Sequence, residues 1–128
     1  MKTRPKQGDV LGWERTFTVE DVRAFARVTG DDGRHHREPD AQGRLAVQGL
    51  LTASLPTKLG GDLDYWAREM TFEFLRPVFT GDTVRCTLTI GEVVEEPGKL
   101  RVNCEVVCVN QHGKEVLRAR TRGVILTG

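Results

Sequence analysis

The sequence has no long apolar segment and almost no net charge, and each of these absences excludes a class of protein. The longest apolar run has four residues, Val106 to Val109, whereas a membrane-spanning helix needs about 20. The 128 residues include 19 lysines and arginines against 18 aspartates and glutamates, which gives a formal net charge of +1. General nucleic-acid binding requires a surplus of positive charge that neutralises phosphates. We therefore expect neither a membrane protein nor a nucleic-acid-binding protein.

Cysteine is also scarce, and Cys86, Cys104 and Cys108 have no metal-binding spacing. Cys104 and Cys108 share the parity of the apolar residues in an alternating segment, which places them on one face of a strand. Free cysteine on such a face behaves as a small hydrophobic residue. A catalytic thiol paired with a histidine is the alternative, which we disfavour because we find nothing near these cysteines that would activate a thiol. We predict core cysteines in a reducing compartment.

The length fits a single domain, which we take to span residues 1–128. Folding should bury about two-thirds of the extended chain surface, enough for a core without disulfide or metal staples. The first residues, Met1 to Lys6, are basic but lack the apolar segment of a secretory signal. We therefore expect a globular, cytoplasmic protein.

The first half of the chain predicts a strand, a helix and a polar loop. Trp13 to Phe17 can form a short strand, and Thr18 to Asp21 resembles a capping box with Thr18 as the N-cap. Gly30 is placed to end this helix in the left-handed conformation. The polar residues 31–44 follow as a loop.

A second helix is predicted over Leu45 to Leu59, with Gly60 and Gly61 at its end. This segment is apolar nearly all round, which is typical of a buried helix. Pro56 lies inside it, and proline there requires the helix to kink or to end.

From Met70 onward the apolar residues follow a period of two, which predicts strands. The alternating segments are Met70–Phe74, Val84–Ile90, Leu100–Cys104 and Leu117–Ile125. Residues 96–98 and 110–113 are short enough to be hairpin turns. We predict an α+β fold in which an antiparallel sheet of about four or five strands curls round the apolar helix.

Two of the three histidines, His35 and His36, lie in the polar loop just after Asp31 and Asp32. A curled loop can bring the side chains of Asp31 and His36 together, where a carboxylate and an imidazole can hold and deprotonate a water. The two aspartates also follow a helix C-terminus, where the macrodipole disfavours negative charge. Taken alone, the segment is more often a capped helix followed by a polar turn. A metal site made of these four residues is the least favoured interpretation, because nothing fixes its geometry.

Several segments, taken in order, resemble the MaoC-like dehydratase family, which includes the (R)-specific enoyl-CoA hydratases. The segments are Phe17–Asp31, His36, Val47–Leu55 and Phe74–Val84. The resemblance extends from about Gly8 to Leu126, and its Pro-Val-x-x-Gly-Asp-Thr element is specific when it follows the other segments. It implies a hot-dog fold, in which a curved antiparallel sheet wraps round one long helix. It also implies a homodimer or an assembly of dimers.

The resemblance places the catalytic Asp and His of a Gly-Asp-x-Asn-Pro-x-His loop on Asp31 and His36. Gly33 and Arg34 stand where the family has Asn and Pro, which makes the loop more flexible. The oxyanion-binding backbone N–H of the family falls on Gly49.

A helix N-terminus suits the role that the resemblance gives to Gly49, because its N–H groups are unpaired. The residues on either side of Gly49 are Gln48, where the family commonly has His, and Leu50. We expect both to bind the substrate.

The implied reaction is the reversible hydration of a trans-2-enoyl-CoA to a (R)-3-hydroxyacyl-CoA, or the same chemistry on an acyl-carrier thioester. It needs no metal and no cofactor. A hot-dog acyl-CoA thioesterase is one alternative. The other alternative is a non-catalytic acyl-CoA-binding module, and the main argument for it is the departure from the family at Gly33 and Arg34.

The alternating Arg118, Arg120 and Arg122 admit two interpretations. They could meet a CoA phosphate, or they could form a solvated strand face or protect a sheet edge. We favour the second interpretation.

Overall fold

The computed structural model describes residues 4–128, so that Met1 to Thr3 of the basic N-terminal segment lie outside the described residues. The elements of this part of the chain are, in order, β1 (Val10–Thr16), α1 (Val19–Thr29), α2 (Arg34–Arg37), α3 (Gly49–Thr52), α4 (Leu55–Asp62), β2 (Tyr65–Phe74), β3 (Thr83–Glu96), β4 (Lys99–Val109) and β5 (Glu115–Leu126).

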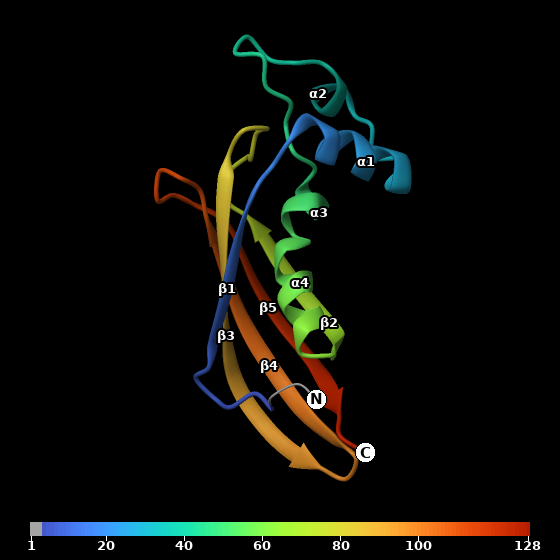
Figure 1. Cartoon of the computed structure of the whole chain (residues 1–128), viewed down its shortest axis with the longest axis vertical. Coiled ribbons are helices and arrows are strands. Elements are labelled where there is room, and N and C mark those ends of the chain that lie inside the picture. Colours follow the sequence, from blue (N-terminus) through green and yellow to red (C-terminus); the bar gives the residue numbers. More distant parts are fainter. Residues whose placement is uncertain (1–3) are drawn as a thin grey trace.

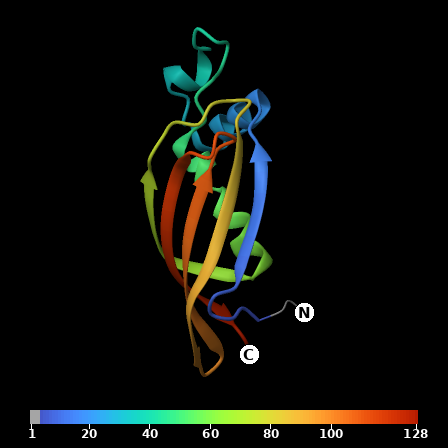
Figure 2. The same cartoon turned by 90° about the vertical axis from the view of Figure 1, so that its left-hand side faces the viewer.

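The five strands form one antiparallel sheet in the order β1-β3-β4-β5-β2. Strands β3, β4 and β5 follow one another through the two predicted hairpin turns, while β1 and β2 lie at the edges. The sheet is curved, with α3 and α4 on one of its faces and α1 and α2 together at one end (Figures 1 and 2). The predicted α+β hot-dog architecture is confirmed.

The period of two places alternate residues of β4 inside the fold. Leu100, Val102, Cys104, Val106 and Cys108 are buried, whereas the residues between them are exposed or partly exposed. The cysteines therefore belong to the core, as predicted. Burial raises the pKa of the Cys104 thiol, which is the opposite of what a nucleophile needs.

Helix α1 begins and ends as the sequence predicts. The Thr18 hydroxyl accepts a hydrogen bond from the Asp21 N–H at 3.1 Å, and the Asp21 carboxylate accepts one from the Thr18 N–H at 3.0 Å. At the other end Gly30 has φ +79°, and its N–H donates to the Ala26 carbonyl at 2.8 Å. These caps fix the point at which the chain leaves the helix for the loop that starts at Asp31.

The prediction of one helix over Leu45–Leu59 is wrong in its boundaries. Residues 45–48 are extended, and Ala46 forms an antiparallel bridge with Phe79. The helix begins only at Gly49, is interrupted after Thr52, and resumes as α4, which runs through Gly60 and Gly61 to Asp62. Pairing of residues 46 and 79 thus overrides the helical tendency of the first residues.

Proline explains where the helix is interrupted. Pro56 lies in the first turn of α4, where its missing N–H would have no partner in any case. The Leu55 carbonyl at this junction accepts a hydrogen bond from Trp13 Nε1 at 2.8 Å, which joins the junction to β1. The helical segment is also less buried than predicted, since Leu55 and Leu59 face the core while Leu50 is 62% exposed.

None of the helices found in residues 4–128 combines the length and the apolar composition that crossing a bilayer requires.

Candidate active site

The loop after α1 carries the predicted catalytic pair. The chain leaves α1 at Gly30, and α2 begins after Gly33 as a single turn in which the His36 N–H donates to the Gly33 carbonyl at 2.9 Å. A Cβ at Gly33 would lie only 3.1 Å from Cε1 of His35. Glycine therefore lets the His35 ring lie against the His36 ring, at 3.8 Å between centroids. This contact is a local consequence of having glycine at this position.

Asp31 and His36 are brought together, as the sequence predicts. His36 Nε2 lies 3.7 Å from Asp31 Oδ1, and the imidazole is 6% exposed whereas the carboxylate is 49% exposed. This distance is too long for a direct hydrogen bond, but a bridging water can span groups at such separations. The pair therefore combines a shielded base with a carboxylate that solvent can reach.

The tautomer of His36 is fixed by its second ring nitrogen. His36 Nδ1 lies 2.7 Å from the carbonyl oxygen of Ala46. Because a carbonyl oxygen only accepts, Nδ1 carries the proton in the neutral ring, and Nε2 presents its lone pair toward Asp31. The Ala46 N–H in turn donates to the His35 carbonyl at 3.0 Å, which ties residue 46 to the same turn.

Gly49 opens α3, and its surroundings form the wall of a cavity. The first N–H groups that bond within the helix are those of Leu51 and Thr52, both to the Gln48 carbonyl. The N–H groups of Gly49 and Leu50 precede them and have no helix carbonyl to bond. A cavity of about 240 Å³ borders Gly49, and its other lining residues include Thr52 and Phe74.

Phe74 is a residue of this wall that sequence reasoning missed. A Cβ at Gly49 would lie 3.2 Å from Cε1 of Phe74, so the aromatic ring lies directly against the glycine. The sequence identifies position 74 only as a strand residue, because its contact with residue 49 depends on how the strand and the helix pack. Among the described residues 4–128, neither Asp31 nor His36 lines this cavity.

The two neighbours of Gly49 differ sharply in exposure. Gln48 is fully buried, and its side-chain Nε2 donates to the carbonyls of Val22 at 2.9 Å and of Asp31 at 3.3 Å. It therefore lies beneath the loop and not on a surface that a substrate would reach. Leu50 is largely exposed, so of the two expected substrate contacts it is the one that stays open.

The alternative metal site does not form. Asp32 lies beside Arg37, 3.7 Å from its Nε, and the His35 ring lies against the His36 ring at a tilt of 44°. In the chain from residue 4 onward, no three His, Cys, Asp or Glu side chains converge in a way that would hold a metal ion.

A second, more apolar groove lies on the other side of α3 and α4. Its volume is about 530 Å³, and Trp13, Phe25, Val28 and Leu51 supply most of its apolar lining. Arg15, Asp21 and Lys58 are its charged lining residues. The sequence shows each residue as part of an apolar helix or strand face, but not that these faces border one groove.

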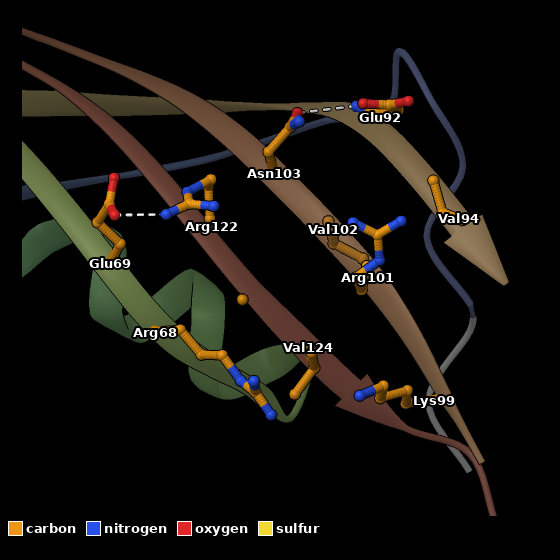
Figure 3. Close-up of a pocket in the computed structure, with 11 residues that line it drawn as sticks. Arg68, Glu69, Glu92, Val94, Lys99, Arg101, Val102, Asn103, Arg122 and Val124 are labelled. Atoms are coloured by element: carbon orange, nitrogen blue, oxygen red, sulfur yellow. Dashed lines mark hydrogen bonds and ion pairs between the residues drawn. The ribbon is translucent and has the colours of Figure 1, made fainter. Parts of the chain in front are cut away.

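Two of the three arginines of β5 form ion pairs on the outer face of the sheet. Arg118 pairs with Glu115 and Arg122 with Glu69, and these carboxylates raise the pKa of both guanidinium groups. A groove of about 350 Å³ on this face is lined by charged side chains of β2, β3, β4 and β5 (Figure 3). It lies toward the turn between β3 and β4, at the end of the molecule opposite α2 (Figures 1 and 3). This geometry favours the solvated strand face that we predicted, whereas protection of an edge is wrong because β5 lies between β4 and β2.

Comparison with known proteins extends over nearly the whole chain. No protein-family model matches the sequence. The mitochondrial 3-hydroxyacyl-(acyl-carrier-protein) dehydratase of Arabidopsis thaliana is 29% identical over 126 residues, which cover 91% of this chain and 74% of the plant protein. The solved structure of the (R)-hydratase from A. caviae has a TM-score of 0.83 at 24% identity, covering 96% of this chain and 98% of that one. A MaoC-like dehydratase from Rhodospirillum rubrum has a TM-score of 0.77 at 19% identity, with coverages of 97% and 94%.

Proposed function

The chain has the fold of the MaoC-like dehydratases and (R)-hydratases, as its sequence resemblance predicted, and from this premise we propose that it hydrates and dehydrates acyl thioesters. The specific reaction we propose is the reversible hydration of a trans-2-enoyl-CoA to a (R)-3-hydroxyacyl-CoA. The observation that carries the proposal is the Asp31–His36 pair, in which a shielded imidazole directs its basic nitrogen toward a half-exposed carboxylate 3.7 Å away.

The acid–base step uses the fixed tautomer of His36. A water held between Asp31 and His36 gives one proton to Nε2, and its oxygen forms a bond to the β-carbon of the enoyl thioester. The electron pair of the double bond moves toward the thioester carbonyl, and the α-carbon takes a proton from the imidazolium to complete the addition. Because the same atoms move in reverse, the pair also serves dehydration.

Two groups of the chain supply electrostatic stabilisation in the proposed reaction. The Asp31 carboxylate stabilises the imidazolium while it exists, and shielding of His36 from solvent strengthens this interaction. The N–H of Gly49, at the start of α3, donates to the thioester oxygen as negative charge develops there. Leu50, exposed beside it, contacts the substrate. Every step uses groups of the chain and of the substrate.

We propose that the active unit is a homodimer formed along β2. This edge strand has exposed residues on both faces, including Trp66 at 64% and Phe74 at 54% exposure. An unpaired edge that carries exposed aromatic side chains favours pairing with a second copy. The edge adjoins the site, since Phe74 packs on Gly49. Sedimentation should show a dimer for the natural chain and a shift to monomer for Trp66→Glu.

The test of function follows the loss of enoyl-thioester absorbance when purified protein meets a short trans-2-enoyl-CoA. We expect turnover by the natural chain, slower turnover in Asp31→Asn and loss of turnover in His36→Ala. Asp32→Asn is the matched control, because Asp32 is adjacent but pairs with Arg37. Full activity of both site variants would refute the assignment of the pair.

The same experiment separates the two alternatives. A thioesterase would release free thiol, which a thiol-reactive dye reports, whereas a hydratase would not. A non-catalytic module would bind acyl-CoA in calorimetry and turn over nothing. Gly33 favours the non-catalytic alternative only if it leaves the loop too flexible to hold Asp31 and His36 in place. In that case Gly33→Asn with Arg34→Pro should raise hydratase turnover markedly.

A further inference from the structure

Gln48 is a polar side chain in a fully buried position, directly before the helix that presents Gly49. Its own carbonyl accepts the first hydrogen bonds of α3, and its Nε2 reaches away from that helix. Nε2 donates to the carbonyl of Val22, inside α1, at 2.9 Å and to the carbonyl of Asp31 at 3.3 Å. One residue therefore joins α1, the loop of Asp31 and the start of α3.

Burying this amide leaves one of its two polar atoms without a partner. Its Oε1 is buried and is the one buried side-chain oxygen or nitrogen in residues 4–128 that lacks a hydrogen-bond partner. A buried polar atom without a partner is destabilising, whereas an aliphatic side chain of similar size would fill the same space without that penalty. Positions at which a sequence breaks such a local rule are typical of functional sites.

Asp31 has few other restraints on its backbone. Its N–H donates to the hydroxyl of Thr29 at 3.1 Å, and its carboxylate is about half exposed. Gly33, two residues later, contributes no side chain to hold the loop. His36, by contrast, is fixed by the Ala46 carbonyl at 2.7 Å. Of the two members of the pair, Asp31 is therefore the one that needs a further anchor.

We infer that Gln48 is the positioning residue for Asp31, an inference that rests on the proposed function. The bond from Gln48 Nε2 orients the peptide group that follows Asp31, and so sets where its carboxylate stands relative to His36. Because the backbone of Gln48 also starts α3, the same residue holds the acid–base pair at a fixed place relative to the N–H of Gly49. It makes no contact with the substrate.

The first test is Gln48→Met, which keeps the length of the side chain and removes its donors. We expect kcat to fall about 10- to 100-fold, as for a misplacement of about 1 Å at a reacting group, with KM within about twofold. The melting temperature should change little, since the loss of the two hydrogen bonds from Nε2 is offset by removal of the unpaired Oε1. The control is Gln42→Met, an exposed residue of the same loop, which should leave both constants unchanged.

The second test is Gln48→Glu, which has the same shape but a titratable group. As the protonated acid it can donate to the Asp31 carbonyl, and as the carboxylate it cannot. Burial favours the protonated form. Since the acid has one O–H in place of two N–H donors, the ratio of its kcat to that of the natural chain should be highest at low pH and fall as pH rises. Circular dichroism at each pH separates this loss from unfolding.

Hydrogen exchange gives a readout without substrate. The His36 amide, bonded to the Gly33 carbonyl, should exchange faster in Gln48→Met, and the amides of β4 should not. If the natural chain is active and Gln48→Met has the same kcat and the same hydrogen-exchange rates, the inference is overturned. Natural chain without hydratase activity would refute the proposed function instead, and the exchange result would still decide whether Gln48 holds the loop.

Discussion

Replacing Asp31 with asparagine tests the proposed chemistry most directly. The substitution keeps the size of the side chain and removes the charge that faces His36 Nε2 at 3.7 Å. Two unit charges at this separation interact by about 1 kcal/mol in a water-like medium and by about 4 kcal/mol at an effective dielectric constant near 20. Asp31 is half exposed and His36 is shielded, so the pair falls between these limits.

The lost stabilisation applies only once the imidazolium forms, so it appears in kcat. The range of about 1 to 4 kcal/mol corresponds to a slowing of about 5- to 1000-fold. Stability should hardly change, because the neutral ground state has no such ion pair and exposed substitutions shift the free energy of unfolding by about 0.5 kcal/mol or less.

The assay is steady-state hydration of an enoyl-CoA, with Asp32→Asn as the control. Asp32 is about as exposed as Asp31 but lies beside Arg37, so its loss should change kcat by no more than about twofold. Equal effects of the two substitutions would refute the reasoning, because a general charge effect of the loop would then explain both.

Three further predictions concern the fold. Tyr65 is the one tyrosine of the sequence, and burial raises its pKa to about 12. Its phenolate absorbance should therefore appear near pH 12 in the folded protein, and stability present below about pH 10 should be lost as pH rises toward 12. Leu55→Ala, at a fully buried position, should lower the free energy of unfolding measured by urea denaturation by about 2 to 5 kcal/mol. Leu50→Ala, at an exposed position, should change it by about 0.5 kcal/mol or less. Equal effects of the two substitutions would contradict the observed helix orientation. Gly123→Ala should destabilise the β2–β5 pairing, because its new Cβ would meet the backbone oxygen of Trp66; an unchanged melting temperature would contradict this close approach.

The sequence was most informative where the chemistry is local. The capping box at Thr18 and the C-cap at Gly30 need only neighbouring residues, and both were predicted correctly. The strands were predictable for the same reason, since a period of two marks each buried face regardless of its partner. The convergence of Asp31 and His36 also depends on a short loop, whose spacing allowed it, although the family resemblance was needed to favour it over a plain polar turn.

The sequence-based predictions were wrong where contacts between distant segments determine the local structure. Residues 45–48 look helical but are extended because Ala46 pairs with Phe79, and no local pattern announces that pairing. Gln48 was expected to meet the substrate, whereas packing against α1 turns its side chain inward. The contact of Phe74 with Gly49 likewise depends on how a strand and a helix meet. Such features need the fold first.

A backbone carbonyl accepts the hydrogen bond that sets the His36 tautomer, and this makes the proton location independent of the side chain at residue 46. Any residue that keeps the extended backbone supplies the same acceptor. Proline is the exception, because the Ala46 N–H is itself engaged with the His35 carbonyl. A scan of substitutions at this position would thus find only proline intolerant. Such a scan would not reveal that the carbonyl of residue 46 prepares the imidazole for proton transfer.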